Sequence, residues 1–402
     1  MPLLATVLLA CTSLLQAAEF DIHKYPADGT RLLWLPPESG FGPSQHAIAS
    51  ALSEQGFDIW LVDLFSSYFL PTVASSLERI PAADIAELIE QAQDQRPLLL
   101  LGSGRGTLPL LRGVHHWQRL HPNRPPPPVL LLSPQFYQRD PVPGRPARLM
   151  PVTGRTNLQL FILQPKKSPW FWKLTEVLPV LEGSGSEVYL QVLPGLRDRF
   201  HFRPDAARTE QAAANRLPVW LTRAARLMLK LPARARPVRA IEQPPPPTPP
   251  GKTERILSPW TANPQPPALR LPDLEGRLHT LNDYRGQVVL VNFWASWCPP
   301  CVHEMPSMQR LADTYSDDGF TVLAVNMAEE QATVRRFLNE RVQVRFTILM
   351  DQNGRALKNW GVFAFPTSFL LDRQGRIRYA LYGAIEWDRE DVQQILQTLL
   401  RE

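Results

Sequence analysis

The C-terminal fold can be read from the stretch Trp-Cys-Pro-Pro-Cys at residues 297–301. A strongly apolar run, residues 287–294, comes just before it, and residues 302–311 have the pattern of a helix. A buried strand, a tight turn with two cysteines and a helix form the setting in which a Cys-X-X-Cys pair carries redox chemistry. The stretch therefore predicts a site of thiol–disulfide exchange.

The two cysteines are expected to differ in role because of their places on the predicted helix. Cys298 would stand at the helix N-terminus, where unpaired backbone N–H groups and the positive end of the helix dipole favour a thiolate. The thiolate is the attacking species in disulfide exchange. Cys301, one turn further on, would face inward and resolve the mixed disulfide that Cys298 forms.

Two other interpretations of the cysteine pair explain less of the sequence. A Cys-X-X-Cys can be half of a zinc site, but zinc takes about four ligands. The third of the three cysteines, Cys11, lies in the N-terminal apolar segment, and His303 is the only histidine close to the pair in sequence. An inert structural disulfide would not need the strand–turn–helix setting. We therefore expect redox chemistry, with no metal and no bound cofactor.

A longer motif around the cysteines resembles a known family. Residues 293–301, Phe-Trp-Ala-Ser-Trp-Cys-Pro-Pro-Cys, are followed by Glu-Met-Pro at residues 304–306. This pattern resembles the TlpA/ResA group of thioredoxin-like, bacterial, extracytoplasmic thiol–disulfide oxidoreductases, over about residues 266–402. The resemblance implies a thioredoxin-like domain, a protein client with a disulfide or thiols, and a membrane thiol carrier as electron donor. It also implies a reductase, with cytochrome c maturation as one setting.

A second signature supports the resemblance. Residues 361–367, Gly-Val-Phe-Ala-Phe-Pro-Thr, open a predicted strand at residues 367–372. In the family the matching proline is cis and lies against the cysteine pair, so a cis bond is expected at Phe365–Pro366, which is uncommon in general. It would leave the backbone beside the cysteines open to an extended client. An ordinary turn proline is the alternative.

The resemblance also implies further site residues. Pro366 would belong to the catalytic set with the cysteines, and the residues expected to contact substrate are Trp297, Phe365 and Thr367. Family members carry an acidic residue where Glu304 falls, and it is thought to assist proton transfer at the cysteines. Glu304 can equally be a first-turn glutamate that complements the helix dipole, and the sequence leaves both interpretations open.

The order of the remaining C-terminal elements fits the same group. The pattern predicts strands at residues 320–327, 344–350 and 377–381, and helices at residues 331–340, 355–360 and 389–400. A minimal thioredoxin has one strand and one helix before its proline. The extra helix–strand pair here is what the TlpA/ResA group has.

The first 18 residues indicate export. Residues 1–18 are apolar and too short to span a bilayer comfortably, which is typical of a signal-peptide core, although no Lys or Arg precedes the run. Cleavage near Ala17 or Ala18 would deliver a periplasmic protein. Leu-Leu-Ala-Cys at residues 8–11 also resembles a lipoprotein cleavage site, so membrane anchoring through a lipid on Cys11 stays open. No later segment is long and apolar enough to cross a membrane.

Residues 19–235 are predicted to form a separate α/β domain. The apolar runs predict strands at residues 31–35, 57–63, 96–101, 129–132, 158–163 and 188–192, with helices at residues 46–55 and 85–93. Alternating strands and helices favour a parallel sheet.

This domain resembles the α/β-hydrolase fold, whose nucleophile elbow is Gly-X-Ser-X-Gly at the end of a strand. Here residues 102–106 read Gly-Ser-Gly-Arg-Gly, which puts Gly104 at the nucleophile position and Ser103 one residue early. The acid is expected near residues 164–170, which hold no Asp or Glu, while His201 matches the usual histidine. A triad acts as a unit, so we expect a non-catalytic module for client binding or scaffolding. The alternative is a serine esterase, using Ser103 and His201, with an ancillary thioredoxin domain.

Other features of the sequence exclude or limit function classes. Residues 236–265 are rich in proline, and the whole chain has 42 prolines. This composition predicts a semi-rigid spacer. A docking motif for a proline-binding partner is the alternative. The net charge of +5 comes with no basic stripe of interleaved aromatics, so nucleic acid is not an expected partner. The glycine-rich turn lacks the Lys-Ser/Thr of a phosphate-binding loop. Three histidines are expected on the surface, without ligand spacing: His115, His116 and His121.

Overall fold

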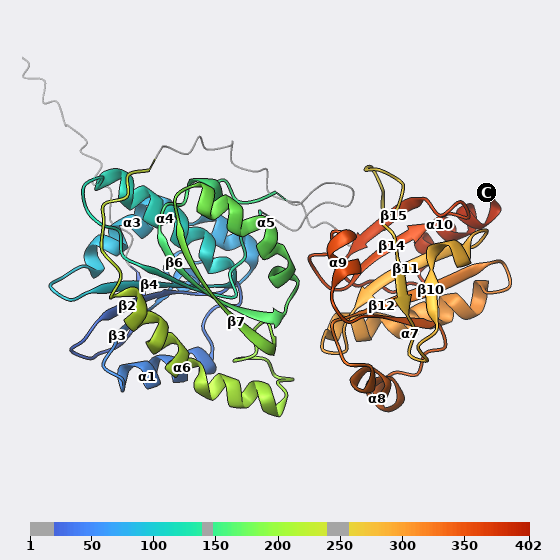
Figure 1. Ribbon diagram of the computed structural model, residues 1–402, viewed down its shortest axis with the longest axis horizontal. Coiled ribbons are helices and arrows are strands. Elements are labelled where there is room, and N and C mark those ends of the chain that lie inside the picture. Colours follow the sequence, from blue (N-terminus) through green and yellow to red (C-terminus); the bar gives the residue numbers. More distant parts are fainter. Residues whose placement is uncertain (1–19, 139–147, 239–256) are drawn as a thin grey trace, which may run out of the picture.

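The computed structural model describes residues 20–138, 148–238 and 257–402. They form two α/β domains that lie side by side, each built on its own sheet (Figure 1). The predicted signal segment at residues 1–18, with Cys11, lies outside the described residues, as does most of the predicted spacer.

The N-terminal domain has a seven-stranded sheet in the order β1-β3-β2-β4-β5-β6-β7. Its strands are β1 (Asp21–Tyr25), β2 (Arg31–Leu35), β3 (Asp58–Asp63), β4 (Leu98–Ser103), β5 (Val129–Leu132), β6 (Gln159–Lys167) and β7 (Glu187–Arg197). β1 runs antiparallel to β3, and the other neighbours are parallel. The central strands are apolar along most of their length because both faces are covered by helices, as parallel sheets require.

Helices pack on the two faces of this sheet. They are α1 (Pro43–Ser53), α2 (Leu64–Ser67), α3 (Ala82–Ala92), α4 (Thr107–Leu120), α5 (Pro169–Gly183) and α6 (Arg208–Met228), with short 3-10 turns at Ala74–Arg79, Gly104–Gly106 and Thr153–Arg155. The apolar faces of α3, α4 and α5 share one core cluster, while α1 and α6 share the other. Because β2 to β7 are parallel, the loops that follow these strands gather at one edge of the sheet.

The C-terminal domain has a six-stranded mixed sheet in the order β13-β12-β11-β14-β15-β8. Its strands are β8 (Ser258–Pro259), β11 (Val288–Trp294), β12 (Phe320–Met327), β13 (Thr347–Asp351), β14 (Thr367–Leu371) and β15 (Ile377–Tyr382). β9 (Arg270–Pro272) and β10 (Leu278–Thr280) form a separate antiparallel pair, followed by a 3-10 turn at Leu281–Tyr284. β11, β12 and β13 are parallel, whereas β14, β15 and β8 alternate in direction.

Helices also cover the C-terminal sheet: α7 (Pro299–Tyr315), α8 (Gln331–Arg341), α9 (Arg355–Asn359) and α10 (Glu390–Arg401). Buried residues of α7, α8 and α10 share one core cluster, and α9 packs into the cluster on the opposite face. Every helix and strand predicted from residue 320 onward is present, and the predicted mixture of α and β structure is confirmed.

The predicted spacer differs from the structure at its C-terminal end. Ser258–Pro259 is strand β8, which pairs with Tyr379 and Ala380 of β15. Leu257 is buried in the C-terminal core, and the ring of Trp260 lies 5.6 Å from that of Phe369. Apolar anchors between the prolines therefore bring residues 257–265 into the C-terminal domain.

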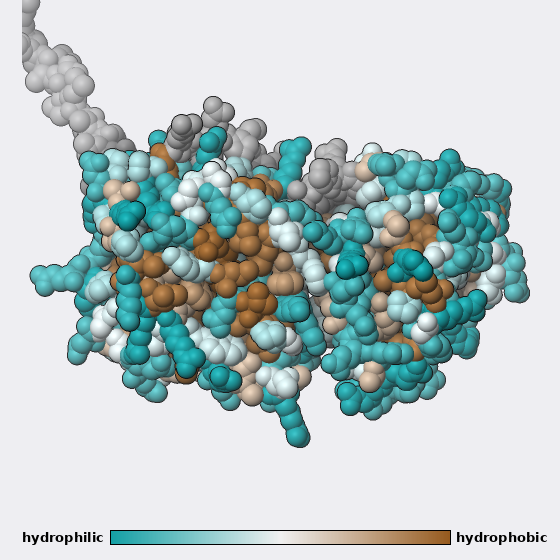
Figure 2. All heavy atoms as spheres, viewed as in Figure 1, coloured by the Kyte–Doolittle hydropathy of each residue, from teal (hydrophilic) through white to brown (hydrophobic). Residues whose placement is uncertain are grey.

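The surface differs from the cores in its polarity. On the face that Figure 2 shows, hydrophilic residues cover most of both domains, and hydrophobic residues are visible between them in smaller patches. Across the part of the chain that the structure describes, no helix combines the length and apolar character that crossing a bilayer requires.

Candidate active site

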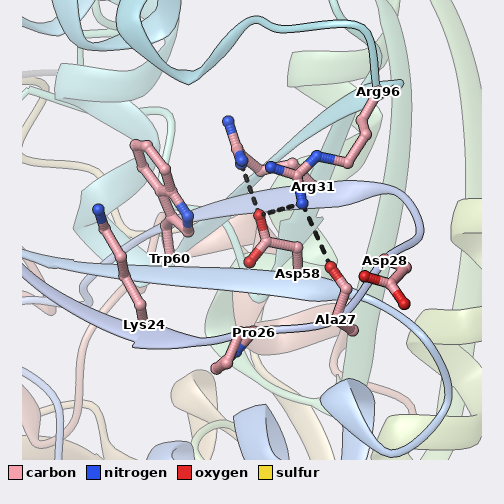
Figure 3. A pocket seen from close by; sticks show the side chains of 8 residues that line it. All are labelled: Lys24, Pro26, Ala27, Asp28, Arg31, Asp58, Trp60 and Arg96. Carbon is pink, nitrogen blue, oxygen red and sulfur yellow. Dashed lines mark hydrogen bonds and ion pairs between the residues drawn. The ribbon is translucent and has the colours of Figure 1, made fainter.

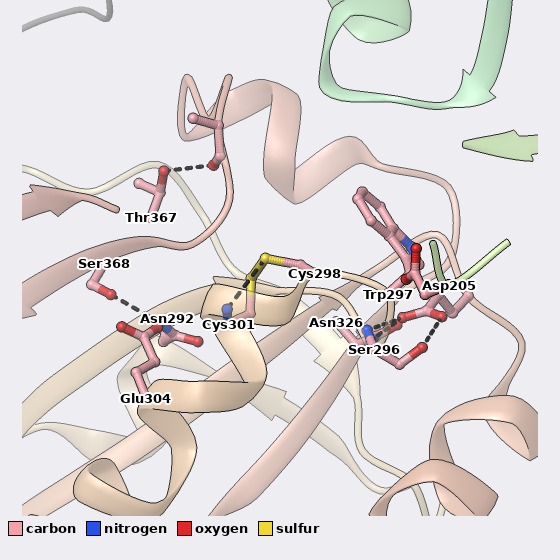
Figure 4. Close-up of a disulfide and its surroundings, with 12 residues drawn as sticks. Asp205, Asn292, Ser296, Trp297, Cys298, Cys301, Glu304, Asn326, Thr367 and Ser368 are labelled. Carbon is pink, nitrogen blue, oxygen red and sulfur yellow. Dashed lines mark hydrogen bonds between the residues drawn. A yellow bond between two sulfur atoms is a disulfide. The ribbon is translucent and has the colours of Figure 1, made fainter. Parts of the chain in front are cut away.

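Cys298 and Cys301 form a disulfide at the start of α7 (Figure 4). β11 leads into the turn, and the helix begins at Pro299, directly after Cys298. Cys298 is the N-cap residue: its Sγ accepts a hydrogen bond of 3.3 Å from the backbone N–H of Cys301. The predicted strand, turn and helix are confirmed, with Cys298 at the helix N-terminus.

The surroundings of the two sulfurs differ. Cys298 is 5% exposed and Cys301 is fully buried. In the reduced protein, the N–H group that now meets the Cys298 Sγ would donate to its thiolate, and the helix dipole would favour the negative charge. The arrangement can therefore hold an attacking thiolate at Cys298 with a protected second thiol one turn behind it.

The expected cis peptide bond at Phe365–Pro366 is present. The Phe365 ring meets the Trp297 ring edge to face, with centroids 5.7 Å apart, and both side chains are half-buried. Thr367 is buried, and its Oγ1 donates a 2.8 Å hydrogen bond to the carbonyl of Ala364. Two of the expected substrate contacts thus lie together beside the disulfide loop, while the third has its hydroxyl engaged in its own turn.

Glu304 is fully buried in the second turn of α7. One carboxylate oxygen accepts a 2.8 Å hydrogen bond from the Asn292 amide, and the other accepts 3.1 Å from the Trp387 indole. Burial raises the pKa of Glu304 to about 8, although the donors from Trp387 and Asn292 act in the opposite direction. The interpretation of Glu304 as a first-turn glutamate that complements the helix dipole is therefore wrong, because the residue lies one turn later and points into the core.

Several residues of this site had not been predicted. Asn292 also donates a 2.9 Å hydrogen bond to Ser368, and both residues are buried. Glu329 accepts hydrogen bonds from the backbone and hydroxyl of Ser296, at 2.7 and 2.6 Å, and so braces the loop before the cysteines. Asn292 had a usable signal, because it is the one polar residue within the apolar run of β11. Glu329 had none.

The N-terminal domain does not assemble the serine–histidine pair of an esterase. The Ser103 hydroxyl accepts a 2.9 Å hydrogen bond from the Trp34 indole. His201 is buried, neither ring nitrogen has a hydrogen-bond partner among the described residues, and burial lowers its pKa to about 3. A histidine in this setting neither hydrogen-bonds to Ser103 nor takes up a proton at neutral pH.

A side chain at the nucleophile position would have to displace the side chain of Glu38. Gly104 has a φ of +51°, and a Cβ atom there would lie 2.6 Å from a carboxylate oxygen of Glu38. Glu38 accepts a 3.1 Å hydrogen bond from the Arg105 backbone and pairs with Arg199.

An acidic residue, Asp198, lies beside residues 164–170, the segment in which the acid of a catalytic triad is expected. Asp198 accepts a 2.5 Å hydrogen bond from Ser168, and burial raises the pKa of Asp198 to about 7. Sequence reasoning found neither Asp198 nor Glu38, because neither belongs to residues 164–170.

A separate hollow of about 520 Å³ lies beside β1 and β3 of the N-terminal domain (Figure 3). Its lining residues are Lys24, Pro26, Ala27, Asp28, Arg31, Asp58, Trp60 and Arg96. Arg31 and Arg96 both pair with Asp58, at 2.8 and 3.1 Å. The two arginines are therefore already engaged by a carboxylate of the domain.

The histidine expectation needs one correction. His115 is buried on α4 rather than on the surface. Among the described residues, no group of three metal-ligating side chains gathers.

Comparison with known proteins places the redox site in a family. The Redoxin family matches residues 261–398, a range that includes both cysteines. Over 133 residues the chain is 41% identical to thiol-disulfide oxidoreductase ResA of Geobacillus thermodenitrificans, covering 33% of this chain and 75% of the relative. ResA of Geobacillus kaustophilus is 38% identical over 133 residues, with the same shares. The solved structure of StoA from Bacillus subtilis is 27% identical and covers 35% of this chain and 99% of its own, with a TM-score of 0.29.

Proposed function

The chain belongs, through its C-terminal domain, to the ResA family of thiol–disulfide oxidoreductases, and from this we propose that it reduces disulfides in exported proteins through Cys298 and Cys301. The observation that carries the proposal is the disulfide at the N-terminus of α7, with one slightly exposed and one buried sulfur. A cysteine so placed is activated when reduced.

The reaction runs in two exchanges. The Cys298 thiolate attacks one sulfur of the client disulfide, a mixed disulfide forms, and the other client sulfur leaves as a thiolate. Cys301 then attacks the Cys298 sulfur, and the second client thiol leaves. Two electrons pass from the protein to the client, and the protein ends with the Cys298–Cys301 disulfide. A thiol donor must reduce that disulfide again, and we assign this to a membrane thiol carrier.

Glu304 is the proposed group that exchanges a proton with Cys301. The two residues are three positions apart on α7, so their side chains lie on the same face of the helix. With a pKa raised to about 8, the carboxyl can exchange a proton with a thiol near neutral pH at little cost in free energy. Trp387 and Asn292 hold its oxygens in place.

The client is proposed to lie along Pro366 in an extended conformation. Trp297 and Phe365 would form the apolar wall that it contacts, because both rings are half-buried beside the disulfide loop. Export by residues 1–18 would place the protein in an oxidising compartment, where the disulfides of client proteins persist. Maturation of cytochrome c is one process that requires such reduction. Whether Cys11 carries a lipid is decided by the mass of the mature N-terminus.

The experiment that tests the function is reduction of insulin disulfides by the full-length protein with dithiothreitol as donor. The wild type should accelerate insulin precipitation, and Cys298→Ser should be no faster than dithiothreitol alone. Equal acceleration by the variant would show that the exchange does not pass through Cys298.

For the N-terminal domain we propose a non-catalytic role in binding or scaffolding a client. The packing of Glu38 against Gly104 and the burial of His201 away from any hydrogen-bond partner in the described chain support this proposal over an esterase. A pocket at the strand ends can keep its shape, and so bind a partner, after the catalytic residues are lost. Retention of a client disulfide protein on the immobilised full-length Cys298→Ser variant, where no covalent link can form through that residue, tests it.

A further inference from the structure

Trp297 is held by both domains. From its own domain it meets Phe365, and from the N-terminal domain the guanidinium groups of Arg197 and Arg203 lie 6.0 and 5.7 Å from the centre of its ring. Figure 4 shows Asp205, from the same N-terminal segment, beside Trp297. Cations at this distance from an indole face are attracted to it.

Arg203 also reaches the backbone next to the reactive sulfur. Its Nη2 donates a 2.7 Å hydrogen bond to the carbonyl oxygen of Trp297. Trp297 is the residue directly before Cys298, whose own N–H donates 3.1 Å to the carbonyl of Ala295. The N-terminal domain thus donates a hydrogen bond into the turn that ends at the N-cap cysteine.

The segment that presents Arg203 is itself held rigidly. Asp205 accepts a hydrogen bond of 2.9 Å from Nε of Arg203 and one of 3.2 Å from Nη1 of Arg197. Arg197 also donates 2.7 Å to Glu210, which is buried. Two arginines and two carboxylates form a cluster with no net charge. Removal of Arg203 alone would leave it with a net negative charge beside the Cys298 turn.

A second contact shows that the domains dock at more than one point. Trp172 of α5 packs against the C-terminal core cluster that includes Leu357 and Trp360. It lies over Gly354, where a Cβ atom would be 2.4 Å from the indole, and Gly354 has a φ of +67°. The glycine therefore makes room for a tryptophan of the other domain.

We propose that Arg203 is a positioning residue for thiol–disulfide exchange, which the N-terminal domain supplies to the active site of the C-terminal domain. It fixes the Trp297 carbonyl and indole, and it keeps a positive charge beside the Cys298 thiolate. An adjacent arginine stabilises a thiolate relative to a thiol, so the dithiol form gains stability relative to the disulfide. The inference rests on the proposed function, because it concerns the same cysteines.

The test is the equilibrium of the full-length protein with glutathione. Protein dithiol and one glutathione disulfide convert to protein disulfide and two glutathione thiols, and alkylation with mass spectrometry gives the fraction of each form. Arg203→Gln should shift the equilibrium constant toward protein disulfide by about three- to tenfold, which is roughly 14–30 mV at 29.6 mV per tenfold change. Arg203→Lys, which keeps a charged donor, should recover part of the shift.

Two further variants separate a specific effect from general damage. Arg216→Gln removes an arginine that lies 5.8 Å over Trp220 within the N-terminal domain, and it should match the wild type. Trp172→Ala loosens the second contact without touching the cysteine turn, and it should shift the constant in the same direction as Arg203→Gln. If Arg203→Gln matches the wild type, the inference is wrong, whatever Trp172→Ala does. If the wild type itself fails to exchange with glutathione, the proposed function fails instead.

Discussion

The Asn292 amide donates to two partners at once, a carboxylate oxygen of Glu304 at 2.8 Å and the Ser368 hydroxyl at 2.9 Å (Figure 4). These hydrogen bonds tie α7 to the two neighbouring strands β11 and β14, and the indole of Trp387 completes the set. A carboxyl group is thereby kept in the core, one helical turn from the buried cysteine. Its protonation should govern both stability and exchange.

Glu304→Gln should remove a pH dependence of stability. Burial raises the pKa of Glu304 from its ordinary 4.5 to about 8, so between these values the folded protein holds a proton that the unfolded chain has released. The free energy of unfolding of the wild type should therefore fall by about 3–5 kcal/mol as pH rises through this window, since a pKa difference of one corresponds to about 1.4 kcal/mol. Urea unfolding at pH 5 and pH 9 measures it, and an equal fall in Glu304→Gln would assign the dependence to another group.

The same variant has a kinetic consequence. The exchange rate of the wild type should show an inflection near pH 8, because the Glu304 carboxyl loses its proton there, and Glu304→Gln should lack it. Gln394→Glu, on an exposed face of α10, is the control for an added carboxylate and should keep the wild-type profile. An unchanged inflection in Glu304→Gln would exclude Glu304 as the group that exchanges a proton with Cys301.

Much of the C-terminal domain could be predicted because its local signals agree with its packing. Strand β11 reads as a nearly unbroken apolar run, and the cysteine turn and the Phe365–Pro366 signature have fixed spacings. The interactions of Glu304 could not be predicted, since Trp387 is 83 residues away and meets it only through the fold. Likewise, nothing in the sequence indicates that Arg203 lies against Trp297.

Fewer elements of the N-terminal domain could be predicted from its sequence, because local preferences conflict there with the packing. Helices α5 and α6 contain Pro179 and Pro218 in their interiors, and proline ordinarily ends a helix. The burial of Leu181, Leu217 and neighbouring apolar residues against the sheet outweighs that local preference. Strand β1 was missed because most of its side chains are polar and exposed, as an edge strand allows.

Cys301→Ala should trap mixed disulfides on Cys298, because no second thiol remains to resolve them. The reduced variant, mixed with a client disulfide protein, should give one adduct that reducing agent removes and that Cys298→Ser with Cys301→Ala lacks. Non-reducing electrophoresis with mass spectrometry identifies the linked cysteine. An adduct located elsewhere, or none, would contradict attack by Cys298.

Glu210→Ala should destabilise the N-terminal domain by about 3 kcal/mol or more, because it leaves the buried Arg197 guanidinium without its main partner. Glu210 accepts hydrogen bonds from the backbone and side chain of Arg197 and from the N-terminus of α6. Glu182→Ala, an exposed glutamate of α5, is the matched control and should stay within about 0.5 kcal/mol of the wild type. Chemical denaturation followed by circular dichroism compares the two variants. Equal stability would show that the pair of Arg197 and Glu210 contributes little to the free energy of unfolding.

The N-terminal domain should show no ester hydrolysis above background. Activated short-chain esters should be turned over no faster by the full-length wild type than by Ser103→Ala or His201→Ala. Ser103→Ala should still lower the unfolding free energy by about 1–3 kcal/mol, since the buried Trp34 indole loses its acceptor. Turnover in the wild type that both variants abolish would mean that the domain is an active esterase.

The most direct test of the central claim is a single-turnover reaction between the fully reduced full-length protein and a peptide disulfide. Rapid quenching, alkylation and mass spectrometry follow both partners. We predict that one peptide disulfide is reduced for each Cys298–Cys301 disulfide that forms, with equal rates, and that Cys298→Ser does neither. Reduction of the peptide without formation of that disulfide, or at the same rate in Cys298→Ser, would contradict the assignment.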